Sequence, residues 1–186
     1  MGRRTAIVVV VPEAQALYDA WRHRWDPAPG IQAHVTLLFP FRPVAEVDDA
    51  LLEELNGLFA AAAPFDVEFA RVGRFEEVAW LAPEPAEPFV ELTRALVDRY
   101  PEHPPYGDED FDWIVPHLTI VNRAPPALRH EVAVALEALL PVHAHAREAT
   151  LLEEGEDGVW RPRATFALGA RAAARVFGEE RRDRTR

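Results

Sequence analysis

The chain has 186 residues and a formal net charge of −11, and all 20 of its basic residues are arginine. Apolar residues make up 49% and charged residues 27%, a composition typical of a globular protein with one domain or two closely packed lobes. Cysteine is absent, which excludes disulfides, thiolate nucleophiles and cysteine-ligated metal centres. Contacts to phosphate supply most of the affinity for long nucleic acid, so an acidic chain is a poor binder of it. We therefore expect no long nucleic acid among the partners.

The first segment of the chain predicts a buried strand. Residues 5–11 (TAIVVVV) form a continuous run of the kind found in strands that are buried on both faces. The run stops at Pro12, which makes it too short for a signal peptide, and no other run approaches the roughly 20 apolar residues of a membrane span. We expect a cytoplasmic monomer with no membrane partner.

Helical and strand patterns alternate along the rest of the chain, and their order is that of an α+β protein. In chain order, the predicted elements are a helix over 13–25, a strand over 33–39, a helix over 46–62, strands over 65–74 and 77–82, a helix over 87–99, a strand over 116–121, a helix over 126–140, and a closing hairpin of strands 142–153 and 159–168. The Pro-rich acidic loop 100–112 is long enough for a lid or binding loop, and a solvated linker is the alternative. The Arg-rich tail 171–186 is expected to be frayed, which leaves residues 1–170 as a single domain.

Two strands carry the same short motif, 83 positions apart. The stretch HVTLLFPF contains His34 and Thr36, and the stretch PHLTIVNR contains His117 and Thr119. Side chains of a strand alternate between its faces, so each His shares a face with the Thr two residues later, while the aliphatic residues between them face the other way. A strand of this pattern suits the wall of a polar cleft. Each motif alone is equally compatible with a half-buried His in a strand.

Together, the two His-x-Thr-x motifs resemble those of the 2H phosphoesterase superfamily, and most closely its 2′-5′ RNA ligase-like branch, which includes cyclic phosphodiesterases. The resemblance in element order extends over residues 5–169, although only the two tetrapeptides are specific. It implies a bilobal fold with two antiparallel sheets related by pseudo-twofold symmetry, helices on the outside, and a central cleft that holds both motifs. The residues that it carries over as catalytic are His34, Thr36, His117 and Thr119.

Two imidazoles that face one cleft suit proton transfer at a phosphodiester. One neutral His takes a proton from the attacking group while a protonated His donates one to the leaving oxygen, and an ordinary pKa near 6.5 lets both forms exist at neutral pH. Thr36 and Thr119 are placed to donate hydrogen bonds to the non-bridging oxygens, each beside its own His. This chemistry requires no metal and no cofactor. The expected substrate is a small nucleotide or an RNA end, and the sequence does not say which His is the base.

Four further residues are candidates for substrate binding. Arg123 and Arg42 follow the two motif strands and are candidates to clamp phosphate, although both would also serve as solvated surface arginines. Phe39 and Trp160 are candidates to stack on a base, with core packing as the alternative. For the neighbouring Phe41, core packing is favoured.

Two other functions stay open at the level of sequence. One is a nucleotide- or RNA-end-binding module of the same fold without turnover, which the intact His and Thr of both motifs argue against. The other is a metal hydrolase that uses His143 and His145, whose imidazoles share one strand face. The second half of a metal-binding motif is missing from the sequence around this pair.

Overall fold

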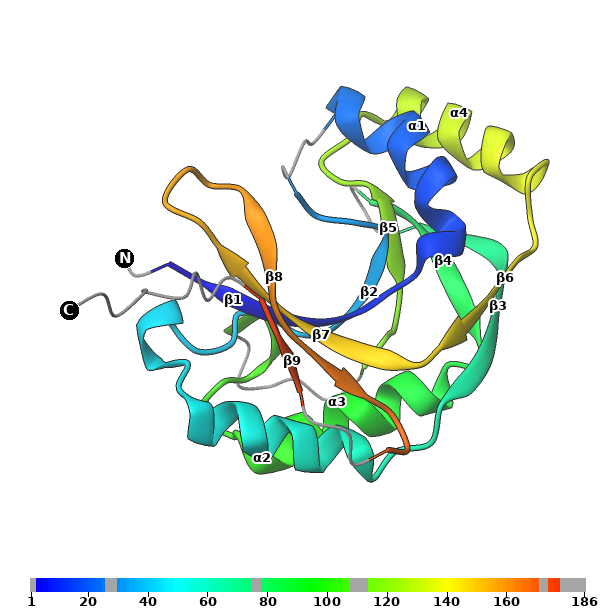
Figure 1. The fold of residues 1–186 in the computed structure, drawn as a ribbon. Helices are drawn as coiled ribbons and strands as arrows, with labels where there is room; N and C mark the ends of the chain where they lie inside the picture. The colour runs from blue at the N-terminus through cyan, green and yellow to red at the C-terminus, as the bar shows by residue number, and fades with distance from the viewer. Residues whose placement is uncertain (1–2, 26–29, 75–77, 108–113, 171–173, 178–186) are drawn as a thin grey trace.

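The computed structural model describes residues 3–25, 30–74, 78–107, 114–170 and 174–177, and its α+β class confirms the expectation (Figure 1). In these ranges the elements are β1 (Thr5–Val10), α1 (Gln15–Trp25), β2 (His34–Leu38), α2 (Asp49–Ala60), β3 (Phe65–Arg74), β4 (Ala79–Glu84), α3 (Glu87–Arg99), β5 (Leu118–Val121), α4 (Pro126–Glu137), β6 (Val142–Ala146), β7 (Glu148–Glu154), β8 (Trp160–Ala167) and β9 (Arg175–Val176). Short 3-10 helices cover Pro12–Ala14, Val44–Glu46 and Pro105–Gly107. None of the helices in the described ranges combines the length and the apolar character that crossing a membrane would take.

The strands of the described residues form one antiparallel sheet in the order β6-β3-β4-β5-β2-β1-β7-β8-β9. The resemblance implied two antiparallel sheets, whereas the described strands join into one. The strands do fall into a first half, β6-β3-β4-β5, and a second half, β2-β1-β7-β8-β9, but the two motif strands join them. The junction between β2 and β5 rests on one register pair, Val35 with Leu118.

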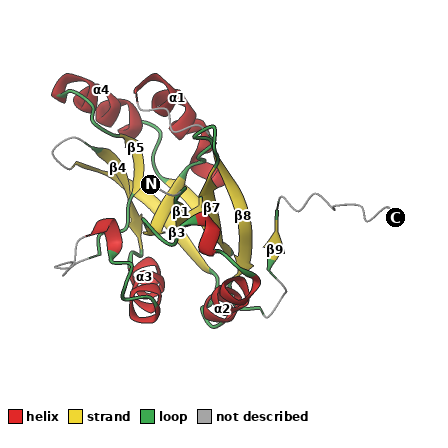
Figure 2. Ribbon diagram, turned by 90° about the vertical axis from the view of Figure 1, so that its left-hand side faces the viewer, coloured by secondary structure: helices red, strands yellow, loops and turns green. Residues whose placement is uncertain are grey.

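The helices cover the sheet in two pairs (Figures 1 and 2). Helices α1 and α4 contact strands of the first half, and helices α2 and α3 contact strands of the second. The pairs lie at opposite sides of the molecule, with the strands between them. Helix α1 follows β1 in the chain but packs against β5, so the chain passes from one half to the other immediately after its first strand.

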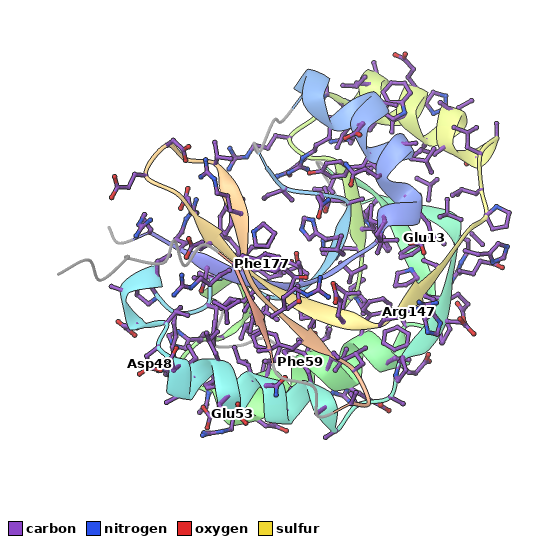
Figure 3. All side chains as sticks on the ribbon, viewed as in Figure 1. Glu13, Asp48, Glu53, Phe59, Arg147 and Phe177 are labelled. Carbon is purple, nitrogen blue, oxygen red and sulfur yellow. The ribbon has the colours of Figure 1, made fainter. Side chains whose placement is uncertain are left out.

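Local sequence explains why these segments form these elements. The β1 run TAIVVV is buried along nearly its whole length, as expected for a central strand. Helix α2 begins after Asp48, whose carboxylate accepts a hydrogen bond from the Leu51 N–H at 2.8 Å and so caps the helix (Figure 3). On its buried side, Phe59 stacks on Phe166 of β8 with ring centroids 5.6 Å apart, which anchors α2 to the second half.

The segment predicted as one strand over 142–153 is in fact two strands. It breaks at Arg147 into β6, which pairs with β3 in the first half, and β7, which pairs with β1 in the second. The Arg147 carbonyl accepts a hydrogen bond from the Leu168 N–H, which extends the register of β7 with β8 by one residue, so the chain leaves β6 at this point. Continuous β character in the sequence cannot reveal such a break, because both strands are good β-formers. The predicted hairpin of β7 and β8 is confirmed.

The C-terminal tail contributes one short strand to the sheet. Within the segment predicted to be frayed, Arg175–Val176 form β9 and pair with β8 at the edge of the second half. Residues 171–173 and 178–186 lie outside the described residues.

The Asp48 cap gives a test of how α2 is held. We expect Asp48→Ala to lower the free energy of unfolding by about 1 kcal/mol, because the Leu51 N–H loses its acceptor at the end of the helix. The measurement is urea unfolding followed by circular dichroism. Glu53→Ala is the matched control, since Glu53 is exposed on the same helix and makes no cap. Equal losses in the two variants would contradict the assignment of the cap.

Candidate active site

The register of the two motif strands brings their polar residues together. Val35 of β2 stands opposite Leu118 of β5 in an antiparallel pair. One residue further along, this register places Thr36 opposite His117 and His34 opposite Thr119. From the sequence, each Thr was predicted to lie beside the His of its own motif. In the structure, each Thr is also directly opposite the His of the other motif on the neighbouring strand. The two His are diagonal neighbours with about 7–8 Å between their backbone positions, which leaves room for a phosphate between the imidazoles.

All four motif residues line one cleft of about 670 Å³. The alternation expected from the sequence is present, since Val35 and Leu118 are fully buried on the opposite face while the His and Thr side chains are half-buried. Among the described residues, the polar and aromatic side chains that share the cleft with the motifs are Arg4, Tyr18, Arg22, Phe39, Thr93, Tyr106, Asn122 and Trp160. The cleft volume is of the size that small-molecule sites have.

Both imidazoles are oriented by the same local hydrogen bond. The Nδ1 of His34 lies 2.7 Å from the carbonyl oxygen of Gln32, and the Nδ1 of His117 lies 2.7 Å from that of Val115. A carbonyl oxygen only accepts, so in both rings Nδ1 carries the proton and donates it. In the neutral rings the unprotonated nitrogen is therefore Nε2.

Burial favours the neutral form of both rings. It lowers the pKa of His34 to about 4, against the hydrogen bond to the Gln32 carbonyl, which acts to raise it. The positive charge of Arg22 and the neighbouring His117 lower the pKa of His34 further. Burial also lowers the pKa of His117, opposed by the hydrogen bond to the Val115 carbonyl.

One side of the cleft carries an aromatic and cationic cluster. Phe39 and Trp160 meet edge to face with ring centroids 6.0 Å apart. The Arg4 guanidinium lies 5.4 Å from the Phe39 centroid and 5.8 Å from that of Trp160, and a bidentate pair with Glu154, at 2.8 and 3.0 Å, holds it there. Trp160 belongs to a small apolar cluster on this wall, with Ala6, Val8 and Leu152. Both aromatic residues predicted to bind substrate thus line the same cleft as the motifs.

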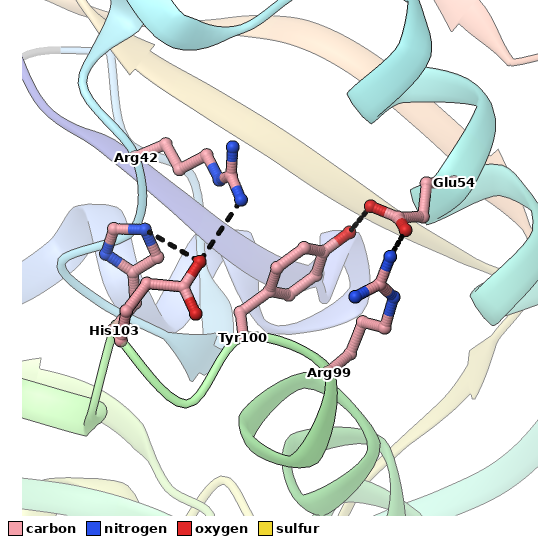
Figure 4. A network of polar contacts seen from close by, with 6 residues as sticks. Arg42, Glu54, Arg99, Tyr100 and His103 are labelled. Carbon is pink, nitrogen blue, oxygen red and sulfur yellow. Dashed lines mark hydrogen bonds and ion pairs between the residues drawn. The ribbon is translucent and has the colours of Figure 1, made fainter.

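Arg42 lies elsewhere, in a network that ties the loop after β2 to the end of α3 (Figure 4). Its guanidinium donates to Glu102 at 3.1 Å and stacks over the Tyr100 ring at 5.4 Å. The Tyr100 hydroxyl donates to Glu54, which also pairs with Arg99. Arg42 is not among the described residues that line the cleft, so its position does not support the predicted role as a phosphate clamp.

Arg123 and the long loop differ in their relation to the cleft. Arg123 follows β5 with a φ of 55° and an exposed side chain, and the lining of the cleft includes its neighbour Asn122 instead. Of the predicted loop 100–112, the described part brings Tyr106 to the cleft, where its N–H donates to the Phe39 carbonyl at 2.6 Å. Residues 108–112 lie outside the described residues, and a lid role for the loop stays a prediction.

His143 and His145, the pair considered above for a metal hydrolase, lie on strand β6 at the surface of the first half. Register pairs set His143 opposite Glu68 and His145 opposite Asp66, and each imidazole contacts its own carboxylate, at 3.4 and 2.5 Å. Across the described ranges, His, Asp and Glu side chains form no group of three placed to hold a metal ion. Each His of this pair thus contacts a different carboxylate.

Sequence reasoning missed Arg4 and Arg22. Arg22 follows Tyr18 by four residues, a spacing that puts both on one helix face, so its place beside an aromatic of α1 was visible in the sequence. That this face borders the cleft was not visible, because α1 packs against a half of the sheet formed later in the chain. Arg4 shares a strand face with Val8, but only the register of β1 with β2 shows that Val8 is opposite Thr36.

A curved antiparallel sheet with helices outside, and paired His-x-Thr-x strands that border one cleft, define the class of the 2H phosphoesterases. The family model described as the 2′-5′ RNA ligase superfamily matches residues 10–158, and the chain belongs to this superfamily. The resemblance drawn from the two motifs is confirmed. A search of curated proteins finds no match to the chain.

Solved structures support the same fold. E. coli LigT complexed with 3′-AMP has a TM-score of 0.60 at 18% identity, over 91% of this chain and 100% of LigT. LigT complexed with NADP+ has a TM-score of 0.58 at 21% identity, over 91% and 99% of the two chains. The protein TT0787 of Thermus thermophilus has a TM-score of 0.60 at 23% identity, over 90% and 98%. These likenesses establish the fold.

The lowered pKa of His34 predicts acid sensitivity. An unfolded His binds a proton near pH 6.5, whereas folded His34 does so near pH 4, so between these values the unfolded chain binds more protons. The contribution of His34 to stability is complete above pH 6.5, and we expect it to be lost as the pH falls toward 4. Urea unfolding at stepped pH measures this slope, which His34→Gln should flatten. An identical slope in both proteins would contradict the prediction.

Proposed function

We propose that the chain is a metal-independent phosphoesterase that hydrolyses 2′,3′-cyclic or 2′-5′ phosphodiesters of nucleotides or RNA ends, or forms them in the reverse direction. In hydrolysis, water attacks phosphorus and gives up a proton to one imidazole. The bond from phosphorus to a ribose oxygen breaks, and the other imidazole, protonated at the start, donates its proton to that oxygen. The product is a phosphomonoester with a free neighbouring hydroxyl, and no metal takes part in the proposed step.

The observation that carries the proposal is the matched presentation of two imidazoles to one cleft. His34 and His117 each donate Nδ1–H to a backbone carbonyl two residues earlier, so Nε2 is the nitrogen that we assign to proton transfer in both rings. Base and acid must stand on different sides of the phosphorus, and a diagonal pair on neighbouring strands meets that requirement.

Thr36 and Thr119 complete the proposed site. Each hydroxyl lies in the cleft across from the His of the other motif, so both are near the space between the imidazoles. We assign them as hydrogen-bond donors to the non-bridging oxygens, where negative charge increases in the transition state.

The wall of the cleft favours a nucleotide as substrate. Arg4 lies four residues before Val8 on β1, or about 13 Å along the strand, and Val8 is opposite Thr36. A nucleotide with its phosphate between the imidazoles would extend along this wall toward Phe39 and Trp160, where a base can stack. The LigT structures are complexes with 3′-AMP and with NADP+, which are nucleotides too. The acidic net charge favours small substrates or short ends over long nucleic acid.

The first test is hydrolysis of ribonucleoside 2′,3′-cyclic phosphates in the presence of EDTA. We expect activity in the wild type and losses of roughly 10²- to 10⁴-fold in kcat for His34→Ala and for His117→Ala, since each removes one proton-transfer group. His143→Ala is the matched control, because its imidazole lies on the exposed edge of the first half. Unchanged activity in both motif variants would refute the two-His mechanism. Tight binding of nucleotide without turnover would favour a binding module, and inhibition by EDTA a metal hydrolase.

The second test concerns the base. We expect Phe39→Leu to raise KM for a ribonucleoside cyclic phosphate about tenfold or more while kcat stays close to that of the wild type, since a stacking contact to the base is lost. A cyclic phosphodiester without a base, such as catechol cyclic phosphate, is the matched control and should show the same KM with both proteins. Equal effects on the two substrates would show that Phe39 shapes the cleft without contacting the base.

A further inference from the structure

Tyr106 has an unusual backbone conformation beside the cleft. Its φ is 57° and its ψ is 12°, in the left-handed region that bulky residues rarely enter. Its side chain is 57% exposed and lines the cleft that holds the two motifs. Burial in the core therefore does not account for an aromatic residue at this strained position. Backbone strain of this kind is concentrated at segments that bind ligands, where the surrounding structure maintains it.

Tyr106 is joined to Phe39, the aromatic residue that follows β2. The Tyr106 N–H donates to the Phe39 carbonyl at 2.6 Å, so the loop after α3 is attached to the loop after β2. The Phe39 ring meets Trp160 edge to face. Within the described ranges, the Tyr106 ring contacts no other aromatic ring. Tyr106 and Phe39 thus border the same part of the cleft, and neither ring covers the other.

A second layer of contacts ties the same two loops together (Figure 4). Arg42 of the loop after β2 donates to Glu102 of the loop after α3 at 3.1 Å, and its guanidinium lies 5.4 Å from the Tyr100 centroid. The Phe41 ring packs edge to face on Tyr100 and on His103, with centroids 5.2 and 5.4 Å apart. These contacts fix the spacing of the loops next to the hydrogen bond that joins them.

A base bound at this part of the cleft would meet aromatic rings from two loops. Aromatic side chains bind bases of every kind by stacking, and the strength of stacking sets the preference among them. A purine has two fused rings and a pyrimidine has one, so a purine offers the larger surface to both side chains. The arrangement therefore favours a purine base.

We propose that Tyr106 is a specificity-determining residue that contacts the base of the bound nucleotide together with Phe39. Arg42, through Glu102, is the positioning residue that holds the loop of Tyr106 against the loop of Phe39. The inference rests on the function proposed above and names its substrate class, purine nucleoside 2′,3′-cyclic phosphates. It gives Arg42 a part in substrate recognition without contact to the phosphate.

The role of Tyr106 is tested by removing its side chain without straining the loop. Glycine adopts a positive φ at no steric cost, so we expect Tyr106→Gly to unfold at the wild-type temperature or above it. We expect its KM for adenosine 2′,3′-cyclic phosphate to rise about tenfold at unchanged kcat, because a stacking contact is lost. The KM for cytidine 2′,3′-cyclic phosphate should rise less. Tyr106→Phe, which keeps the ring, should retain the wild-type KM for both substrates.

Catechol cyclic phosphate, which has no base, is the control substrate, and its KM should be the same for the wild type and for Tyr106→Gly. A rise in KM on the catechol substrate equal to that on the adenosine substrate would show that Tyr106 only shapes the cleft, and it would overturn the proposal. An unchanged KM for the adenosine substrate would overturn it too. Equal rises for adenosine and cytidine would overturn the purine preference.

The positioning role of Arg42 is tested by a double-mutant cycle. We expect Arg42→Gln to raise KM for adenosine 2′,3′-cyclic phosphate by about twofold to fivefold, since a partly exposed ion pair holds the loop weakly. Added to Tyr106→Gly, it should raise KM no further, because the side chain that it positions is gone. Arg71→Gln is the matched control, since Arg71 pairs with Glu84 at 3.2 Å on β3 and β4, outside the lining of the cleft. Rises in KM that multiply in the double variant would overturn the positioning role.

Failure of this inference can be told from failure of the proposed function. An active wild type with an unchanged KM in Tyr106→Gly would overturn the base contact and leave the two-His phosphoesterase in place. A wild type that turns over neither ribonucleoside substrate would refute the phosphoesterase, and calorimetry with adenosine 2′-monophosphate would then decide the base contact. Weaker binding to Tyr106→Gly than to the wild type would uphold the contact. Equal binding, or none to either protein, would overturn it.

Discussion

The pairing of β2 with β5 is the constraint on which the rest of the structure depends. A single register pair, Val35 with Leu118, joins the halves of the sheet and also aligns the two motifs. Because side chains alternate along a strand, a slip of one residue in either strand would turn its His and Thr into the core and its aliphatic residues into the cleft. The buried faces of the two strands resist that slip, since both aliphatic residues are fully excluded from solvent. Hydrophobic burial thus specifies the arrangement of the polar groups.

The orientation of the imidazoles is set more locally. Each His binds a carbonyl only two residues back in its own strand segment, so the same local contact sets the tautomer of both rings. The asymmetry between the two rings comes from more distant segments, α1 for His34 and β4 for His117. A symmetric pair of motifs is therefore placed in an asymmetric setting.

The sequence was sufficient to predict the features that depend on local patterns. The α+β class, the alternation around His34 and His117, and the common cleft of the motifs with Phe39 and Trp160 all follow from periodicity or from the paired motifs. Features that depend on which strands become neighbours were not predictable. The break at Arg147 falls inside a run of β-formers. Arg22 enters the cleft from a helix that crosses to the other half, whereas Arg42, close to a motif in sequence, is drawn away by Glu102 and Tyr100.

The crossing at Arg147 also bears on how the chain reaches its native state. The first half draws its strands from residues 65–84, 118–121 and 142–146, and the second from 5–10, 34–38 and 148–176, so neither half is a continuous stretch of chain. Strand β1 leaves the ribosome first, but one of its two partners, β7, is made some 140 residues later. Neither half can close before most of the chain has been synthesised, and contacts of such long range make folding slow. The cleft that holds the two motifs therefore depends on strands that lie far apart in the chain.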